Sequence, residues 1–159
     1  EIYDKIIAAF NQIPKMDISL VEPLLKDISD RIALIDEFLK EIVPLSEFRI
    51  ENIKSTLKDK IENSELQIDP NRFEQELIYY LEKQDVTEEI VRLQSHLNYF
   101  LETTKTDSPN GKKLGFICQE IGREINTIGS KASNAEMQKI VVNMKNELEK
   151  IKEQLLNIL

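Results

Sequence analysis

The chain has 159 residues, of which 41% are hydrophobic and 31% charged, a composition that favours long amphipathic helices over a sheet with many tight turns. No apolar run reaches the roughly 18 residues of a membrane span, and the single Cys118 excludes an internal disulfide, so we expect a cytoplasmic protein with no membrane partner. The net charge of −8 argues against a general nucleic-acid binder, because lysine and arginine must neutralise phosphates.

The first half of the chain is predicted to form three helices joined by short connections. Apolar residues recur at three- and four-residue steps, the spacing that places them on one helix face. Proline ends a helix because it lacks a backbone donor, and polar residues cap helix starts. The predicted helices are residues 2–12, ended by Pro14; residues 17–42, capped by Asp17 or Ser19 and broken or kinked at Pro44; and residues 46–61, capped by Ser46.

The second half is predicted to form four more helices after a polar connection at residues 63–70. The sequence TDSPNG marks a loop at residues 106–111, and Ser133 with Glu136 forms a capping box. The predicted helices cover residues 71–83, 86–105, 112–127, and Ser133 to the C-terminus, with a loop around Gly129. Helices with narrow apolar stripes bury little surface alone, so we expect an all-α fold of about six or seven helices in elongated hairpins or a bundle, some coiled-coil-like.

Three further features of the sequence bear on how the chain works. Residues 1–70 carry 9 basic and 15 acidic side chains, whereas residues 71–159 carry 12 and 14, so local basic patches are expected in the second half. Apolar positions left over on the first and last helices indicate a homo-oligomer. An apolar helical pattern begins directly after Glu1, which suggests that the sequence is part of a longer protein.

Polar residues suited to catalysis gather on two of the predicted helices. Glu89, Arg92 and His96 share one stripe at i, i+3 and i+7. Glu120 and Glu124 lie at i and i+4, where two exposed carboxylates repel each other by roughly a few tenths of a kcal/mol. A divalent cation would reverse that repulsion, and carboxylate oxygens suit Mg²⁺ or Mn²⁺. The same spacing is also that of an ordinary solvated glutamate pair.

Other residues could contact phosphate groups. Lys112 and Lys113 open a helix, where free backbone N–H groups also attract anions. The hydroxyl groups and the lysine of residues 126–133 could hold a phosphate oxygen, or could simply cap two helices. His96 is the sole histidine, and histidine is the side chain that exchanges protons most readily near neutral pH, although a lone histidine is often only a surface or interface residue.

Four short motifs occur in order and at matched separations in the second half. They are RLQSH at residues 92–96, QEIGREINT at residues 119–127, SKASNAE at residues 130–136 and KEQ at residues 152–154. With NRFEQEL at residues 71–77, they resemble the C-terminal region of the YicC-type bacterial endoribonucleases. The resemblance divides the chain into a variable helical segment, residues 1–70, and a signature region, residues 71–159.

The resemblance implies a divalent-metal-dependent endoribonuclease, or the C-terminal portion of one, that acts on RNA as a ring-like homo-oligomer, a hexamer in the family. In this hypothesis the catalytic residues are His96, Glu120 and Glu124; the ligands of Mn²⁺ or Mg²⁺ are Glu89, Glu120 and Glu124; and the RNA-binding residues are Arg92, Lys112, Lys113, Arg123, Asn126, Ser130 and Lys131. Gly115 and Gly122 stand where the family usually has aspartate and asparagine. These departures favour the alternative, a catalytically inert helical module for oligomerisation or for binding RNA or a partner.

Overall fold

The computed structural model describes residues 2–11, 18–65, 67–106 and 111–158, and the regular structure in these ranges is entirely helical, which confirms the predicted all-α fold. The helices are α1 (Ile2–Asn11), α2 (Ile18–Glu62), α3 (Pro70–Gln84), α4 (Thr87–Thr104), α5 (Gly111–Lys131) and α6 (Ala135–Leu156). None of these helices is both long and apolar enough to cross a membrane. Pro14, the side chains of Asp17 and Ser19, and residues 107–110 of the predicted loop lie outside the described residues.

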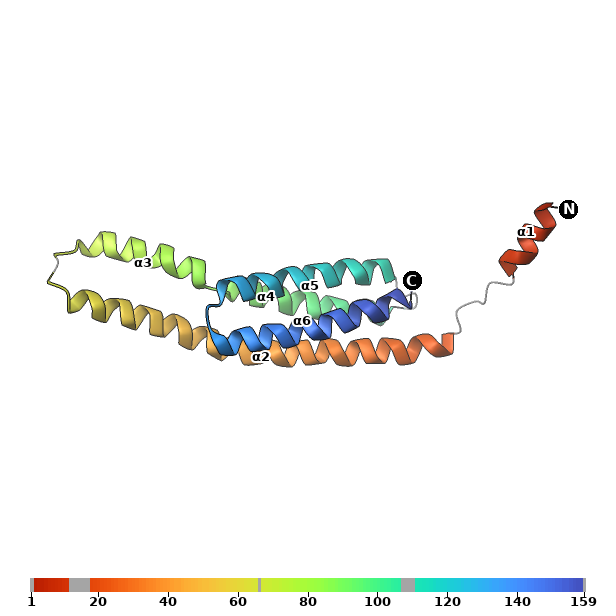
Figure 1. Ribbon diagram of the computed structural model, residues 1–159, viewed down its shortest axis with the longest axis horizontal. Helices are drawn as coiled ribbons and strands as arrows, with labels where there is room; N and C mark the ends of the chain where they lie inside the picture. The colour runs from red at the N-terminus through yellow and green to blue at the C-terminus, as the bar shows by residue number, and fades with distance from the viewer. Residues whose placement is uncertain (1, 12–17, 66, 107–110, 159) are drawn as a thin grey trace.

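Four helices surround the hydrophobic core. The first half of α2 packs against α4 and α6, and α5 completes the bundle between α4 and α6 (Figure 1). Each helix contributes a stripe of buried side chains, and burying a leucine or isoleucine side chain stabilises the fold by roughly 1.5–3 kcal/mol. The largest fully buried side chains are Ile28, Ile32, Ile35, Leu39, Ile42, Leu93, Leu97, Phe100, Leu114, Ile121, Ile125 and Ile128.

Of the two alternatives predicted at Pro44, a break or a kink, the break is wrong, because α2 continues through Pro44 to Glu62. An interior proline disfavours a helix by roughly 3 kcal/mol, since it removes one hydrogen bond and crowds the preceding turn. Here Pro44 faces solvent, while Ile42 before it and Ser46 after it are buried. Packing on both sides of the proline therefore outweighs the local penalty.

The second half of α2 and the whole of α3 form a hairpin that extends beyond the bundle (Figure 1). We call this unit, residues 48–84, the hairpin arm. No residue of α3 is buried, and Ile78, Tyr79 and Tyr80 are all exposed, in contrast to the apolar stripes of the bundle helices. The arm is therefore a two-helix projection whose own apolar surface is only partly covered.

The connection between α5 and α6 differs from the sequence prediction in two ways. Helix α5 runs through Gly129 to Lys131, so the predicted loop around Gly129 is wrong. A Cβ atom at Gly129 would lie 3.1 Å from Val141 Cγ1, which shows that α6 packs closely against α5 at this position. The cap of α6 is Asn134, whose side chain accepts a hydrogen bond from the Met137 N–H, and not the predicted Ser133.

Candidate functional site

Most of the predicted site residues lie on α4 and α5, which run antiparallel. Near one end of the pair, Lys131 Nζ lies 2.8 Å from Glu89 Oε1. Near the other end, Lys113 Nζ lies 5.0 Å from the centre of the Tyr99 ring. On α4 the positions 89, 92, 96 and 99 follow at three- and four-residue steps, and on α5 the positions 113, 120, 124 and 131 follow at seven- and four-residue steps. Each set therefore lies on the side of its helix that the two contacts join. We call the surface made by these two sides the α4–α5 face.

The ion pair between Glu89 and Lys131 is the most buried charged contact of the face. The Glu89 side chain is 6% exposed and the Lys131 side chain 30% exposed. Lys131 Nζ also donates to the backbone oxygen of Asp85 at 3.3 Å. A carboxylate loses its hydration when it is buried, and a lysine at hydrogen-bond distance offsets that loss. Glu89 is therefore held by Lys131 within the chain, which leaves it less available as a metal ligand.

Arg49 links the hairpin arm to this ion pair, and the sequence prediction missed it. Its Nη2 atom donates to the backbone oxygen of Gln84 at 2.8 Å, to Gln84 Oε1 at 2.6 Å and to the backbone oxygen of Lys131 at 3.2 Å. The two backbone oxygens belong to the last residues of α3 and α5. The C-terminal end of a helix carries the negative end of the helix dipole, which favours a cation such as Arg49 there. Burial lowers the pKa of the Arg49 guanidinium below its ordinary value.

The position of Arg49 in the sequence carries a signal that could have revealed it. Leu39, Ile42, Ser46 and Arg49 follow one another at three- and four-residue steps, and all four are buried. A polar or charged residue in an apolar stripe needs a buried partner, because an unpaired buried charge is strongly unfavourable. The stripe therefore predicts a polar contact at Arg49, although not its acceptors, which come from distant parts of the chain.

Three side-chain atoms are buried without a hydrogen-bond partner in the described part of the chain, and all belong to this linked group. They are Nε and Nη1 of Arg49 and Oε2 of Glu89. An unsatisfied buried polar group costs about 1–3 kcal/mol, so such atoms are rare and call for an explanation. Their concentration around one junction sets this region apart from the remainder of the described fold.

Glu120 and Glu124 lie one turn apart on α5 but have different surroundings. Glu124 is 4% exposed, and no described residue forms a hydrogen bond or an ion pair with it. Glu120 is half-exposed, and one of its oxygens lies 3.6 Å from Nη1 of Arg123, whose side chain is 71% exposed. The predicted solvated pair is therefore wrong for Glu124, because the packing of α4 and α6 against α5 covers it.

The remaining predicted residues lie on or near the surface. His96 is half-buried in the middle of α4, and Arg92, one turn before it, is exposed and paired with Glu88. Lys112, Lys113 and Asn126 are exposed on α5, and Ser130 donates its hydroxyl hydrogen to the backbone oxygen of Thr127 at 3.0 Å. The two helices thus carry two exposed arginines, Arg92 and Arg123, and two buried glutamates, Glu89 and Glu124.

The predicted carboxylate ligands of a metal ion are not brought together as a set. Within the described residues, no group of three or more histidine, cysteine, aspartate or glutamate side chains could hold a metal ion. Glu89 is paired with Lys131, near the C-terminal end of α5. Of the three predicted ligands, the neighbouring Glu120 and Glu124 are those that Lys131 does not hold.

Comparison with known proteins places the sequence among one group of relatives. Residues 42–159 match the family model described as Endoribonuclease YicC-like, C-terminal. A Clostridioides difficile protein described as "Probable endoribonuclease YicC" is 41% identical over 140 residues, which cover 85% of this chain and 47% of that protein. A Haemophilus influenzae protein of the same description is 37% identical over 105 residues, 66% of this chain and 37% of that protein.

The chain belongs to the YicC-like endoribonuclease family. It spans less than half the length of these curated relatives. The family match begins at residue 42, inside α2, so it includes the hairpin arm and Arg49 as well as the α4–α5 face.

The two glycines that depart from the YicC pattern have different surroundings. A Cβ atom at Gly115 would meet no heavy atom within 4 Å. An aspartate could therefore occupy position 115 without a steric conflict, so packing does not account for this glycine. At Gly122 a Cβ atom would lie 3.3 Å from Leu148 Cδ2, so a larger residue there would require the leucine on α6 to shift.

Proposed function

We propose that this chain is the RNA-cleaving C-terminal portion of an endoribonuclease, and that RNA lies across the α4–α5 face. The observation that carries the proposal is that α4 and α5 each hold a buried carboxylate, Glu89 and Glu124, with an exposed arginine, Arg92 and Arg123, within one helical turn of it in the sequence. Buried ionisable groups are unfavourable for stability and are concentrated at functional sites. The YicC relatives, each described as a probable endoribonuclease, support the same activity.

The chemistry of phosphodiester cleavage suits these residue types. The attacking oxygen must lose a proton, the leaving oxygen must gain one, and the charge on the phosphate must be neutralised. In our proposal Glu124 and His96 handle the two protons, because one is a buried carboxylate and the other the chain's sole imidazole. Arg92 and Arg123 neutralise phosphate charge, which an exposed guanidinium does well through paired N–H groups.

A divalent cation, Mn²⁺ or Mg²⁺, is a separate part of the proposal. It would supply positive charge next to the scissile phosphate. Since the described residues of one chain do not form a three-ligand cluster and Glu124 handles a proton, the donor left for the ion is the half-exposed Glu120. Cleavage measured with Mn²⁺ and with EDTA tests the cation independently of the protein residues.

The experiment compares cleavage of a labelled, structured RNA by the chain and by its Glu120→Ala plus Glu124→Ala variant. We expect the double variant to lose at least about 100-fold in rate, the range of a lost proton-transfer or charge-stabilising group. The matched control is Glu37→Ala plus Glu41→Ala, a pair of exposed glutamates at the same spacing on α2, which should retain full activity. Equal rates in all three proteins would refute the assignment of the site.

The second candidate function is an inert helical module that assembles into a homo-oligomer. The observation in its favour is the hairpin arm, which leaves Ile78, Tyr79 and Tyr80 exposed on a helix with no buried residue. Exposed apolar surface of this kind is typical of interfaces between proteins. Light scattering tests it: an oligomer that binds RNA without cleaving it would favour this second function, and a strict monomer would exclude assembly.

A further inference from the structure

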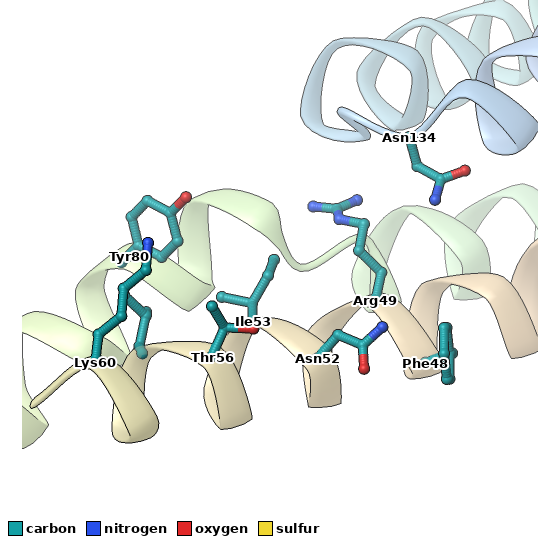
Figure 2. Close-up of a pocket in the computed structure, with 9 residues that line it drawn as sticks. Phe48, Arg49, Asn52, Ile53, Thr56, Lys60, Tyr80 and Asn134 are labelled. Atoms are coloured by element: carbon teal, nitrogen blue, oxygen red, sulfur yellow. The ribbon is translucent and has the colours of Figure 1, made fainter. Parts of the chain in front are cut away.

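A pocket of about 330 Å³ lies where the hairpin arm joins the bundle, away from the middle of the α4–α5 face. Its walls come from α2, from α3 and from the residue that caps α6, as Figure 2 shows. The lining residues are Phe48, Arg49, Asn52, Ile53, Thr56, Leu57, Lys60, Tyr80 and Asn134. This volume lies at the small end of the range for small-molecule sites.

The charge of the pocket is opposite to that of the whole chain. The chain has a net charge of −8, yet the lining includes the cations Arg49 and Lys60 and no carboxylate. Electrostatic attraction is screened less beside a low-dielectric wall than in bulk water, so two cations at one pocket favour an anion.

Hydrogen-bond donors add to this preference. Asn134 uses its Oδ1 to accept the Met137 N–H at 3.0 Å, which leaves its amide group to donate, and Figure 2 shows its nitrogen on the side toward Arg49. Arg49 is 8% exposed, and its Nε and Nη1 have no hydrogen-bond partner among the described residues. A buried guanidinium with unused N–H groups in the wall of a pocket is typical of a site that binds an anionic group.

Aromatic side chains at the same pocket indicate what accompanies the anion. Phe48 is 67% exposed and Tyr80 is 46% exposed, so each ring leaves apolar surface in contact with solvent. Figure 2 shows Tyr80 on α3 facing across to the α2 side chains. Exposed aromatic rings beside cations form the stacking platforms on which single-stranded nucleic acids place their bases.

We propose that this pocket binds one nucleotide unit, with its phosphate directed toward Arg49 and Asn134 and its base placed on Tyr80 or Phe48. Lys60 adds positive charge about three turns further along α2. The unit belongs either to single-stranded RNA or to a free mononucleotide, because both offer the same phosphate and base. The RNA case rests on the proposed function, in which RNA also contacts the α4–α5 face. The pocket would then hold a nucleotide some distance from the position of cleavage.

The test measures the anisotropy of a fluorescein-labelled single-stranded RNA octamer, and competition by AMP, UMP and inorganic phosphate. We expect Tyr80→Ala to weaken RNA binding about tenfold, the usual effect of losing one stacked base. We expect Lys60→Gln to weaken it about threefold and to reduce the salt dependence by about one phosphate contact. The matched controls are Tyr79→Ala, an exposed neighbour on α3, and Lys26→Gln, an exposed lysine elsewhere on α2.

Arg49→Gln is less informative alone because it also removes the hydrogen bonds that join α2 to α3 and to α5, so circular dichroism must first show that each variant is folded. If AMP or UMP displaces the labelled RNA at a lower concentration than inorganic phosphate does, the pocket binds a nucleotide. If AMP and UMP do not displace the RNA, and Tyr80→Ala still weakens RNA binding, the pocket binds a nucleotide unit of RNA. Binding unchanged in Tyr80→Ala and Lys60→Gln overturns the proposal. Loss of cleavage in Glu124 variants, with this binding intact, would separate the two sites.

Discussion

Replacing Lys131 with methionine tests whether the buried ion pair on the α4–α5 face supports the fold. The substitution keeps the length and apolar part of the side chain but leaves Glu89, 6% exposed, without its cation at 2.8 Å. Glu89 Oε2 already lacks a partner among the described residues, so the carboxylate would then have no hydrogen bond to a side chain.

The structure sets the expected size of this effect. Removing one partner of a fully buried pair destabilises a protein by about 3–5 kcal/mol. Lys131 keeps 30% of its side chain exposed, so water weakens the pair and we expect about 2 kcal/mol. For a chain of this size, that loss lowers Tm by roughly 4–8 °C.

Urea unfolding followed by far-UV circular dichroism measures this difference. The control is Lys139→Met, an exposed lysine on α6, which should change the free energy of unfolding by less than about 0.5 kcal/mol. Adding Glu89→Gln to Lys131→Met should recover about half of the loss, because the buried charge is removed. If Lys131→Met is as stable as Lys139→Met, our description of the ion pair as a buried, coupled contact is wrong.

Three further predictions concern single residues. Gly115→Ala should stabilise the chain by about 1 kcal/mol, because alanine favours a helix and its Cβ would meet no atom within 4 Å. Gly129→Ala should destabilise it by about 1 kcal/mol, because its Cβ would lie 3.1 Å from a valine on α6. Chemical denaturation measures both changes in the free energy of unfolding. Burial raises the pKa of Cys118 to about 12, so a thiol reagent at pH 8 should modify it only at the rate of unfolding; fast labelling of folded protein would contradict this. Asp85→Ala should remove about 1 kcal/mol at pH 7, since Asp85 Oδ1 accepts the Thr87 N–H at 2.9 Å. Hydrogen bonds from Thr87 lower the pKa of Asp85 in the folded state, so the difference should be complete above the ordinary value of 3.8 and lost as pH falls below it; a constant difference from pH 7 to pH 2 would refute this.

The sequence predicted the bundle well because the apolar period alone identifies a helix and its buried face. The stripe of α4, with Leu93, Leu97 and Phe100, is buried as that period indicates. The predicted breaks failed where packing outweighs local preference. Pro44 and Gly129 both lie inside helices, since buried neighbours hold α2 together and α6 packs closely on α5.

The candidate site could be predicted only in part. Spacing placed Glu120 and Glu124 on one helix, but their different exposure depends on which neighbouring helices cover α5. The pairing of Glu89 with Lys131 joins residues 42 positions apart, and Arg49 reaches acceptors 35 and 82 positions away. No local pattern encodes such contacts, because they are formed when the helices pack.

The most direct test of the proposed function is the cleavage rate and RNA affinity of Glu124→Gln, which keeps the shape of the buried side chain and removes its charge. If Glu124 takes part in proton transfer, cleavage should fall by at least about 100-fold while RNA affinity and Tm change little. Cleavage at the rate of the unsubstituted chain, or a loss of cleavage matched by an equal loss of folded protein, would contradict a catalytic role for the α4–α5 face.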